Sequence, residues 1–95
     1  MTEKQLEREK LQQFFLSIWS KRPHKSEISG IYLGKECLTI FAHHIFPWRK
    51  YPQGKYDEEN IIILTPDEHG NVESNMYRYE EINKRRNKLK IKYNL

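Results

Sequence analysis

The sequence predicts an α+β fold in which two short strands and a helix form a central unit between an N-terminal and a C-terminal helix. Apolar side chains recur at helical spacing over residues 3–20, and a second helical pattern covers residues 76–93. Between them lie two short apolar segments rich in strand-forming residues, 37–42 and 61–64. The second segment leads directly into a helix start at residues 65–68.

The composition fits a small folded protein with a polyanionic partner. The chain has 95 residues, which predicts a single domain over residues 1–95, and its 13% of aromatic residues argues against disorder. A net charge of +4 favours nucleic acid as the partner. Cys37 is the only cysteine, which excludes an intramolecular disulfide and fits a cytoplasmic protein. The charged N-terminus is unlike a signal peptide, and no apolar run is long enough for a membrane span, so we expect no membrane association.

The first predicted helix has a recognisable start, an apolar face and an end. Thr2 and Gln5 have the spacing of a capping box, in which each side chain bonds the backbone of the other residue. Pro23 disfavours helix at the residue before it, so the helix should end near residue 20. The apolar side chains at helical spacing are Leu6, Leu11, Phe14, Phe15, Ile18 and Trp19. We expect this face to pack onto the rest of the domain, with an oligomer contact as the alternative.

A loop, a strand and a second loop should follow. Residues 23–36 contain turn-forming residues and little periodicity. The segment CLTIFA, residues 37–42, predicts a strand that delivers His43 and His44 at its end. Residues 45–59 contain two prolines and a glycine without periodicity, so we expect a second loop there.

The central unit should continue with a buried strand and a capped helix. Asn60 opens the apolar run at residues 61–64, which is too short for a helix and therefore predicts a strand. Thr65 can serve as the N-cap, Pro66 occupies the first helical position, and Glu68 completes a capping box. These residues fix the helical phase of the positions that follow.

The C-terminal segment predicts a basic helix. After a break at Ser74-Asn75, helical spacing resumes over residues 76–93. The residues that can share its apolar face are Tyr79, Ile82, Leu89 and Tyr93. Its cations are Lys84, Arg85, Arg86, Lys88, Lys90 and Lys92. Such a run is usually a solvated face whose field attracts polyanions without specificity.

Three histidines of the central unit have spacings that can bring metal ligands together. His69 and Glu73 are four positions apart in the predicted helix, so they share one face. His43 and His44 are neighbours at a strand end, so they should point to opposite sides and do different jobs. Two imidazoles and one carboxylate leave open positions on a metal ion for water and a phosphate oxygen. The remaining histidine can take a proton from water at neutral pH, and Asn60 can pin the loop by bonding its backbone.

This pattern resembles the HNH (His-Me finger, ββα-metal) endonucleases over about residues 37–75. The residues that carry the resemblance are His43-His44, followed by Ile45-Phe46-Pro47, then Asn60 sixteen positions after His44, then His69 nine positions after Asn60. The resemblance implies that His43 and His69 are metal ligands, that His44 is the general base, and that Asn60 orients it. It also implies a small ββα-metal core flanked by the two outer helices. Phage recombination nucleases are a branch to which the chain is similar, which would place it in the cytoplasm of a bacterial or phage-infected cell.

The chain departs from the family pattern at Glu73, where many members have a second histidine. A carboxylate can still coordinate, and this harder oxygen ligand favours one Mg²⁺ or Mn²⁺ ion, with Zn²⁺ or Ni²⁺ as alternatives. The cysteines of the zinc ribbon found in many members are also missing, so ordinary packing must hold the first half of the chain.

The resemblance implies hydrolysis of DNA phosphodiester bonds. One divalent cation would stabilise charge on the leaving 3′ oxygen while His44 activates water for in-line attack. The cations expected to hold phosphates are Arg49, Lys50, Lys55, Arg85 and Arg86. Trp48 and Tyr51 could stack on bases or cap the loop against the core. His24, in a polar loop, should be structural.

Two other functions compete with this interpretation. The first is a non-catalytic nucleic-acid-binding module in which His43, His69 and Glu73 hold a structural zinc. It differs from the nuclease in giving His44 no chemical task. The second is a non-haem iron oxygenase built on two histidines and one carboxylate, but the chain is too short for the scaffold and pocket that such a centre needs.

Overall fold

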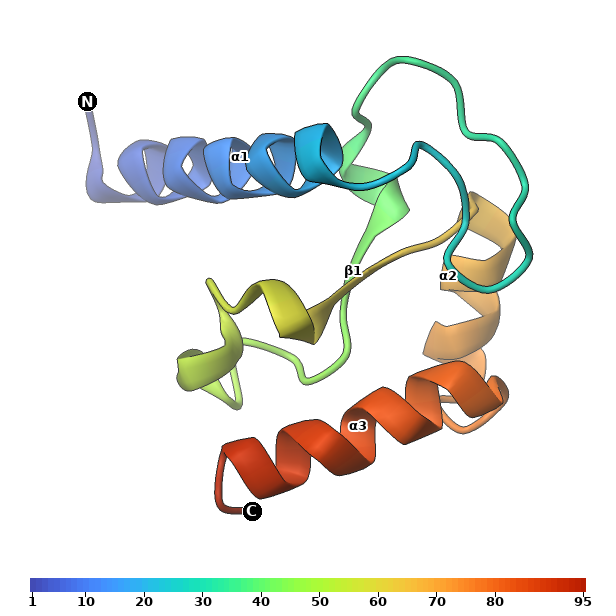
Figure 1. Cartoon of the computed structure of the whole chain (residues 1–95). Coiled ribbons are helices and arrows are strands. Elements are labelled where there is room, and N and C mark those ends of the chain that lie inside the picture. Colours follow the sequence, from blue (N-terminus) through green and yellow to red (C-terminus); the bar gives the residue numbers. More distant parts are fainter.

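The computed structural model describes residues 1–95 and confirms the predicted α+β class. Figure 1 shows three helices around two short strands. The elements in chain order are α1 (Glu3–Lys21), η1 (Thr39–Phe41), β1 (Ala42–His44), η2 (Pro52–Gly54), η3 (Glu58–Asn60), β2 (Ile61–Ile63), α2 (Pro66–Ser74) and α3 (Glu80–Lys92), where η marks a short 3₁₀ turn. None of the helices combines the length and the apolar character that crossing a bilayer demands.

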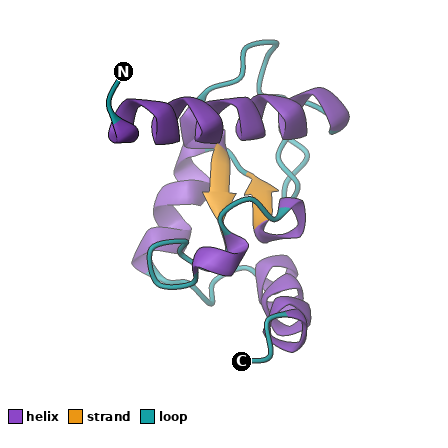
Figure 2. Cartoon of the chain, turned by 90° about the vertical axis from the view of Figure 1, so that its left-hand side faces the viewer, coloured by secondary structure: helices purple, strands orange, loops and turns teal.

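The two strands form the middle layer between helices. β1 pairs antiparallel with β2, so that His43 lies opposite Ile62 and His44 lies opposite Ile61. In both Figure 1 and Figure 2, α1 and α3 lie on opposite sides of these strands. Because side chains alternate along a strand, β2 contributes to two apolar clusters.

Each face of β2 is buried in its own cluster. Ile61 and Ile63 face α1, in a cluster with Phe15, Ile18, Trp19 and Phe41. Ile62 and Leu64 face the other way, in a cluster with Ile45, Phe46, Val72, Ile82 and Leu89 from the loop, α2 and α3. None of the side chains of β2 is more than 2% exposed. The short sheet therefore holds both halves of the core together.

α1 is confirmed in its start, in its end and in most of its apolar face. The capping box between Thr2 and Gln5 is formed, and the helix ends at Lys21. Phe15, Ile18 and Trp19 are buried against β2. Leu6 is an exception to the predicted face, because it is 47% exposed on the part of the helix that extends past the core.

The segment that leads into β1 differs from the prediction. Residues 37–42 were expected to form a strand, but Thr39–Phe41 form a 3₁₀ turn and β1 contains only Ala42–His44. The turn places the Phe41 ring on Trp19, with their centroids 5.7 Å apart in a stacked arrangement. This burial outweighs the local strand propensity.

The start of β2 differs in a similar way. Asn60 is the last residue of the turn Glu58–Asn60, and not the first residue of the strand. The Asp57 side chain accepts a hydrogen bond from the Glu59 N–H and so favours the turn.

α2 is confirmed, whereas α3 begins later than predicted. Thr65 caps α2, its capping box with Glu68 is formed, and the helix ends at Ser74. The next helix was expected from residue 76 but begins at Glu80. Arg86 donates to the Met76 carbonyl and Asn83 donates to the Tyr77 carbonyl, so side chains of α3 hold this segment in a turn.

The outer edge of β2 is covered by Glu27, a residue of the loop that follows α1. Its N–H donates to the Ile63 carbonyl, and its carboxylate accepts from the Ile63 N–H at 2.7 Å. The same carboxylate accepts from Arg22 at 2.8 Å and from Arg85 at 3.1 Å. Glu27 thus takes the place of a third strand and ties α1 and α3 to the sheet edge.

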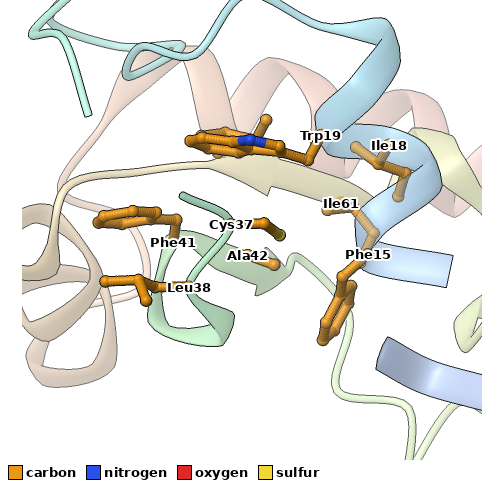
Figure 3. A pocket seen from close by; sticks show the side chains of 9 residues that line it. Phe15, Ile18, Trp19, Cys37, Leu38, Phe41, Ala42 and Ile61 are labelled. Carbon is orange, nitrogen blue, oxygen red and sulfur yellow. The ribbon is translucent and has the colours of Figure 1, made fainter. Parts of the chain in front are cut away.

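A small apolar cavity lies between α1 and the strands. Its nine lining residues are all hydrophobic, and Figure 3 shows the Cys37 side chain in their midst, with Trp19 and Phe41 on one side and Phe15 on the other. Its volume is about 10 Å³. A space this small and this apolar is a packing gap and not a ligand site. Burial there raises the pKa of the Cys37 thiol, as expected for a structural cysteine.

Replacing Glu27 should destabilise the fold far more than replacing a neighbouring exposed glutamate. In Glu27→Gln, the guanidinium groups of Arg22 and Arg85 lose their shared carboxylate. We expect the free energy of unfolding to fall by about 2 kcal/mol. The control is Glu81→Gln, which removes only the more exposed ion pair with Arg85 and should cost less than about 0.5 kcal/mol. Urea unfolding followed by circular dichroism measures both values, and equal losses would contradict the role of Glu27.

Candidate active site

The register of β1 sends its two histidines to opposite faces of the sheet. Residues directly opposite each other in an antiparallel pair point to the same side. His44 therefore shares the face of Ile61, toward α1, and its ring centroid is 5.7 Å from that of Phe15. His43 shares the face of Ile62, toward α2. The predicted opposite orientation of the two neighbouring histidines is present.

His43 meets His69 of α2. Their ring centroids are 4.9 Å apart in an edge-to-face arrangement. His69 Nδ1 lies 2.6 Å from the Ile40 carbonyl, which can only accept, so this nitrogen carries a proton, and in the neutral ring Nε2 carries the lone pair. Nε2 in turn lies 3.3 Å from a carboxylate oxygen of Glu73. The Ile40 carbonyl of the turn η1 thus keeps a proton on Nδ1, in the way that backbone carbonyls often orient metal-bound histidines.

The residues predicted to bind metal lie near one another but do not form a finished site. His69 contacts both His43 and Glu73. As the side chains lie, no group of three or more His, Cys, Asp or Glu side chains is arranged to hold a metal ion. Glu73 is 70% exposed and has no partner except His69. The nitrogen and oxygen donors suit a divalent cation chemically, and Glu73 would have to move for the three side chains to bind one ion.

Burial keeps His43 neutral. Desolvation, followed by the charges of His69, His44 and Arg86, lowers the pKa of His43 from 6.5 to about 4. A neutral imidazole is the form that binds metal ions. His43 makes no hydrogen bond within the protein, so its ring nitrogens are not committed to another group.

His44 is held by the backbone in one tautomer. Its Nε2 donates to the Lys55 carbonyl at 3.0 Å, which leaves Nδ1 unprotonated in the neutral ring. Burial lowers the pKa of His44. The hydrogen bond to the Lys55 carbonyl raises this pKa in part, and the charge of the Lys55 side chain lowers it further. At neutral pH the imidazole is therefore a free base with a fixed orientation.

Asn60 pins the loop that carries this carbonyl. Its side chain is fully buried, accepts from the Phe46 N–H at 2.8 Å, and donates to the carbonyls of Phe46 and Gly54 at 3.0 Å. Asn60 makes no hydrogen bond to His44. It helps to position the His44 imidazole indirectly, because Gly54 precedes Lys55, whose carbonyl accepts from that ring. The predicted pinning of the loop by Asn60 is present.

The histidines line one groove together with basic side chains. The groove has a volume of about 450 Å³, and its polar lining residues are His43, His44, His69, Glu73, Arg49 and Arg86, with Trp48 at its rim. Arg86 is only 5% exposed, donates to Asn83 and to the Met76 carbonyl, and leaves its Nε without a partner. No carboxylate pairs with it. A buried guanidinium without a counter-ion favours an anion in this groove.

The other predicted phosphate-binding cations differ in how free they are. Arg49 and Lys50 are exposed and form no ion pair, although Lys50 lies over the Tyr51 ring, which itself packs on Phe46. Arg85 is bound to Glu27 and Glu81. Lys55 is bound to Glu7 of α1 and lies 4.1 Å above the Trp48 ring. Arg49 and Arg86 are therefore the cations that the groove presents.

Three further contributors could not have been found from residue types. The carbonyls of Ile40 and Lys55 fix the tautomers of His69 and His44, and a backbone carbonyl leaves no mark in a sequence. Gly54 is required because a Cβ there would lie 2.7 Å from Asn60 Nδ2. In the sequence Pro52-Gln53-Gly54, nothing distinguishes this glycine from an ordinary turn residue. His24 is structural as expected, since it stacks on Trp19 with ring centroids 4.1 Å apart.

Gly54→Ala should damage the pinned loop. The added Cβ must displace the Asn60 side chain, which three hydrogen bonds hold in place, so we expect the free energy of unfolding to fall by about 1–3 kcal/mol. The control is Gly70→Ala in α2, where a Cβ meets nothing within 4 Å. This change should instead add about 0.5–1 kcal/mol, because alanine favours helix. Chemical unfolding measures both, and shifts in the same direction would contradict the close approach at Gly54.

The depressed pKa of His43 predicts acid sensitivity of the metal-free protein. Below pH 6.5 the unfolded chain protonates this ring, whereas the folded chain resists protonation down to about pH 4. The free energy of unfolding should therefore fall as the pH drops through this window, by roughly 1–3 kcal/mol from His43. Urea unfolding in EDTA at several pH values measures this free energy. It should depend less steeply on pH in His43→Gln than in the wild type. If the free energy of unfolding fell equally with pH in both proteins, the pKa of His43 would not be lowered by folding.

The chain was compared with models of known protein families, with curated proteins and with solved structures, and no match was found in any of the three.

Proposed function

We propose that the protein is a metal-dependent endonuclease that hydrolyses phosphodiester bonds of DNA. One observation carries this proposal: the neighbouring residues His43 and His44 face opposite sides of the sheet and still line the same groove. His43 contacts His69. His44 bonds the Lys55 carbonyl through Nε2 and keeps Nδ1 free. This division between metal binding and proton transfer is the one that the resemblance to HNH endonucleases implies.

His44 is the general base of the proposed reaction. Its Nδ1 takes a proton from a water molecule, the water oxygen forms a bond to phosphorus, and the bond from phosphorus to the 3′ oxygen breaks in line with it. The leaving oxygen takes up a proton and becomes a 3′ hydroxyl, and the phosphate stays on the 5′ end of the other product. The fixed tautomer supports this role, because Nε2 is committed to Lys55 and only Nδ1 can accept.

His43, His69 and Glu73 are the residues that would hold the cation. Bound there, a divalent cation would stabilise negative charge on the leaving oxygen and on the scissile phosphate. The neutral state of His43 and the committed Nδ1 of His69 both prepare nitrogen lone pairs for this purpose. The carboxylate of Glu73 favours Mg²⁺ or Mn²⁺ over Zn²⁺ or Ni²⁺.

Arg86 and Arg49 would bind the phosphate groups. Arg86 lines the groove without a carboxylate partner, so its positive charge would favour a phosphate group there. Arg49 is exposed and lines the same groove, so it could bind a flanking phosphate. The engaged cations, Arg85 and Lys55, are less suited to this role than the sequence indicated.

His44→Ala should abolish cleavage and spare binding. Loss of a positioned general base costs about 10²–10⁴-fold in rate. The nicking of supercoiled plasmid with Mg²⁺ or Mn²⁺ should fall by this factor, while Mn²⁺ binding by calorimetry and duplex affinity by fluorescence anisotropy change less than about threefold. The control is His24→Gln, which changes a histidine outside the groove and should keep the wild-type nicking rate.

The same measurements distinguish the nuclease from a non-catalytic module. A wild type that binds DNA and Zn²⁺ but cuts under no divalent metal would overturn catalysis and favour the structural-zinc alternative. Equal nicking by the wild type and by His44→Ala would also overturn it, because the base would then lie elsewhere.

A further inference from the structure

The N-terminal half of α1 extends beyond the core. Residues 1–10 are all exposed, whereas the second half of the helix buries Phe15, Ile18 and Trp19. Figure 1 shows this half extending away from the sheet toward the N-terminus. Its one side-chain hydrogen bond to the rest of the chain joins Glu7 to Lys55. Apolar packing therefore does not explain why the chain keeps these turns next to the loop.

A second groove lies between this half of α1 and the loop that follows β1. Its volume is about 630 Å³, and its charged lining residues are Glu3, Lys4, Glu7, Arg8, Arg49 and Lys55. Glu7 and Lys55 neutralise each other. Lys4, Arg8 and Arg49 form no ion pair, so three free cations face one free carboxylate, Glu3. The groove is positive, which suits a polyanion.

This groove continues the one that contains the histidines. Trp48 and Arg49 line both grooves, so the two meet at this part of the loop. The loop is held firmly there, because Lys55 lies over the Trp48 ring and Asn60 pins its backbone. A strand whose scissile phosphate lies beside His44 therefore has a continuous basic path along Arg49 to α1.

We propose that Lys4 and Arg8 of α1, together with Arg49, bind the phosphate backbone of DNA next to the scissile bond. This inference rests on the proposed nuclease function and adds a second binding surface to it. The Glu7–Lys55 pair contributes to this surface, because it anchors the exposed half of α1 to the loop. Arg8, one position further along the helix, stays free to bind phosphate. The contacts would be sequence-independent, since phosphates carry no base information.

Charge reversals on α1 test this surface with a matched control. Arg8→Glu changes a cation that lines the second groove, and Lys10→Glu changes one that does not. Both are exposed on the same helix, about 200° apart around its axis, and both alter the net charge equally. Neither residue is part of the core. The background is His44→Ala with Mg²⁺, so that the duplex stays intact during the measurement.

The expected result is a difference in affinity and in its salt dependence. By fluorescence anisotropy with a labelled 30-base-pair duplex, Arg8→Glu should weaken binding about 5–20-fold at 50 mM NaCl. It should also reduce the slope of log affinity against log salt by about one. Lys10→Glu should weaken binding by less than about twofold with an unchanged slope. Lys4→Glu added to Arg8→Glu should lower affinity further.

The outcomes separate this inference from the proposed function. If the wild type nicks plasmid and the two reversals bind alike, the α1 surface is overturned and the nuclease stands. If Arg8→Glu binds more weakly than Lys10→Glu but the wild type nicks under no metal, the surface stands and catalysis is overturned. If the wild type neither binds nor cuts DNA, both are overturned together.

Discussion

The pairing of three residues of β1 with three residues of β2 decides what each histidine can do. A slip by one residue would exchange the faces of His43 and His44, because side chains alternate with a period of two. The slip is opposed on both flanks, where the Ile45 N–H donates to the Asn60 carbonyl and the Leu64 N–H donates to the Phe41 carbonyl, both at 2.8 Å. It is opposed further by the burial of β2 on both faces, since either cluster would lose its isoleucines. The register of a very short sheet is thus set by long-range packing around it.

Electrostatics in the groove follow from this arrangement. Burial lowers the pKa of both His43 and His44, so neither ring adds a positive charge at neutral pH. The fixed charges that remain are the arginines and the carboxylate of Glu73. In the proposed function, the buried guanidinium, the neutral imidazoles and the exposed carboxylate of this groove would take a phosphate and a cation together, because each ligand compensates the charge of the other.

Features set by neighbouring residues could be predicted from the sequence. The capping boxes Thr2–Gln5 and Thr65–Glu68 involve residues three positions apart, and both helix starts are correct. The helical spacing of His69 and Glu73 is local in the same sense, and their contact is present. The opposite faces of His43 and His44 follow from strand geometry alone.

Features that depend on distant residues could not be predicted. The 3₁₀ turn before β1 exists because Phe41 packs on Trp19, and the late start of α3 depends on side chains that reach back to residues 76 and 77. The sequence also does not show which cationic side chains are free of ion pairs. Lys55 is taken by Glu7, which lies 48 positions earlier, whereas Arg86 has no carboxylate. Composition counts charges but does not show which of them are paired.

The contact between His69 and Glu73 explains how the site can change state without a change of fold. With Nδ1 committed to Ile40, the neutral ring points a lone pair at a carboxylate oxygen 3.3 Å away. Two acceptors at this distance repel each other unless a cation lies between them, and the divalent ion of the proposed nuclease would supply that charge. His43, His69 and Glu73 would hold the ion once the Glu73 carboxylate turned toward the two imidazoles. Because Glu73 lies in the last turn of α2 and is mostly exposed, this movement needs only a side-chain rotation, while the buried strands that position both histidines stay as they are.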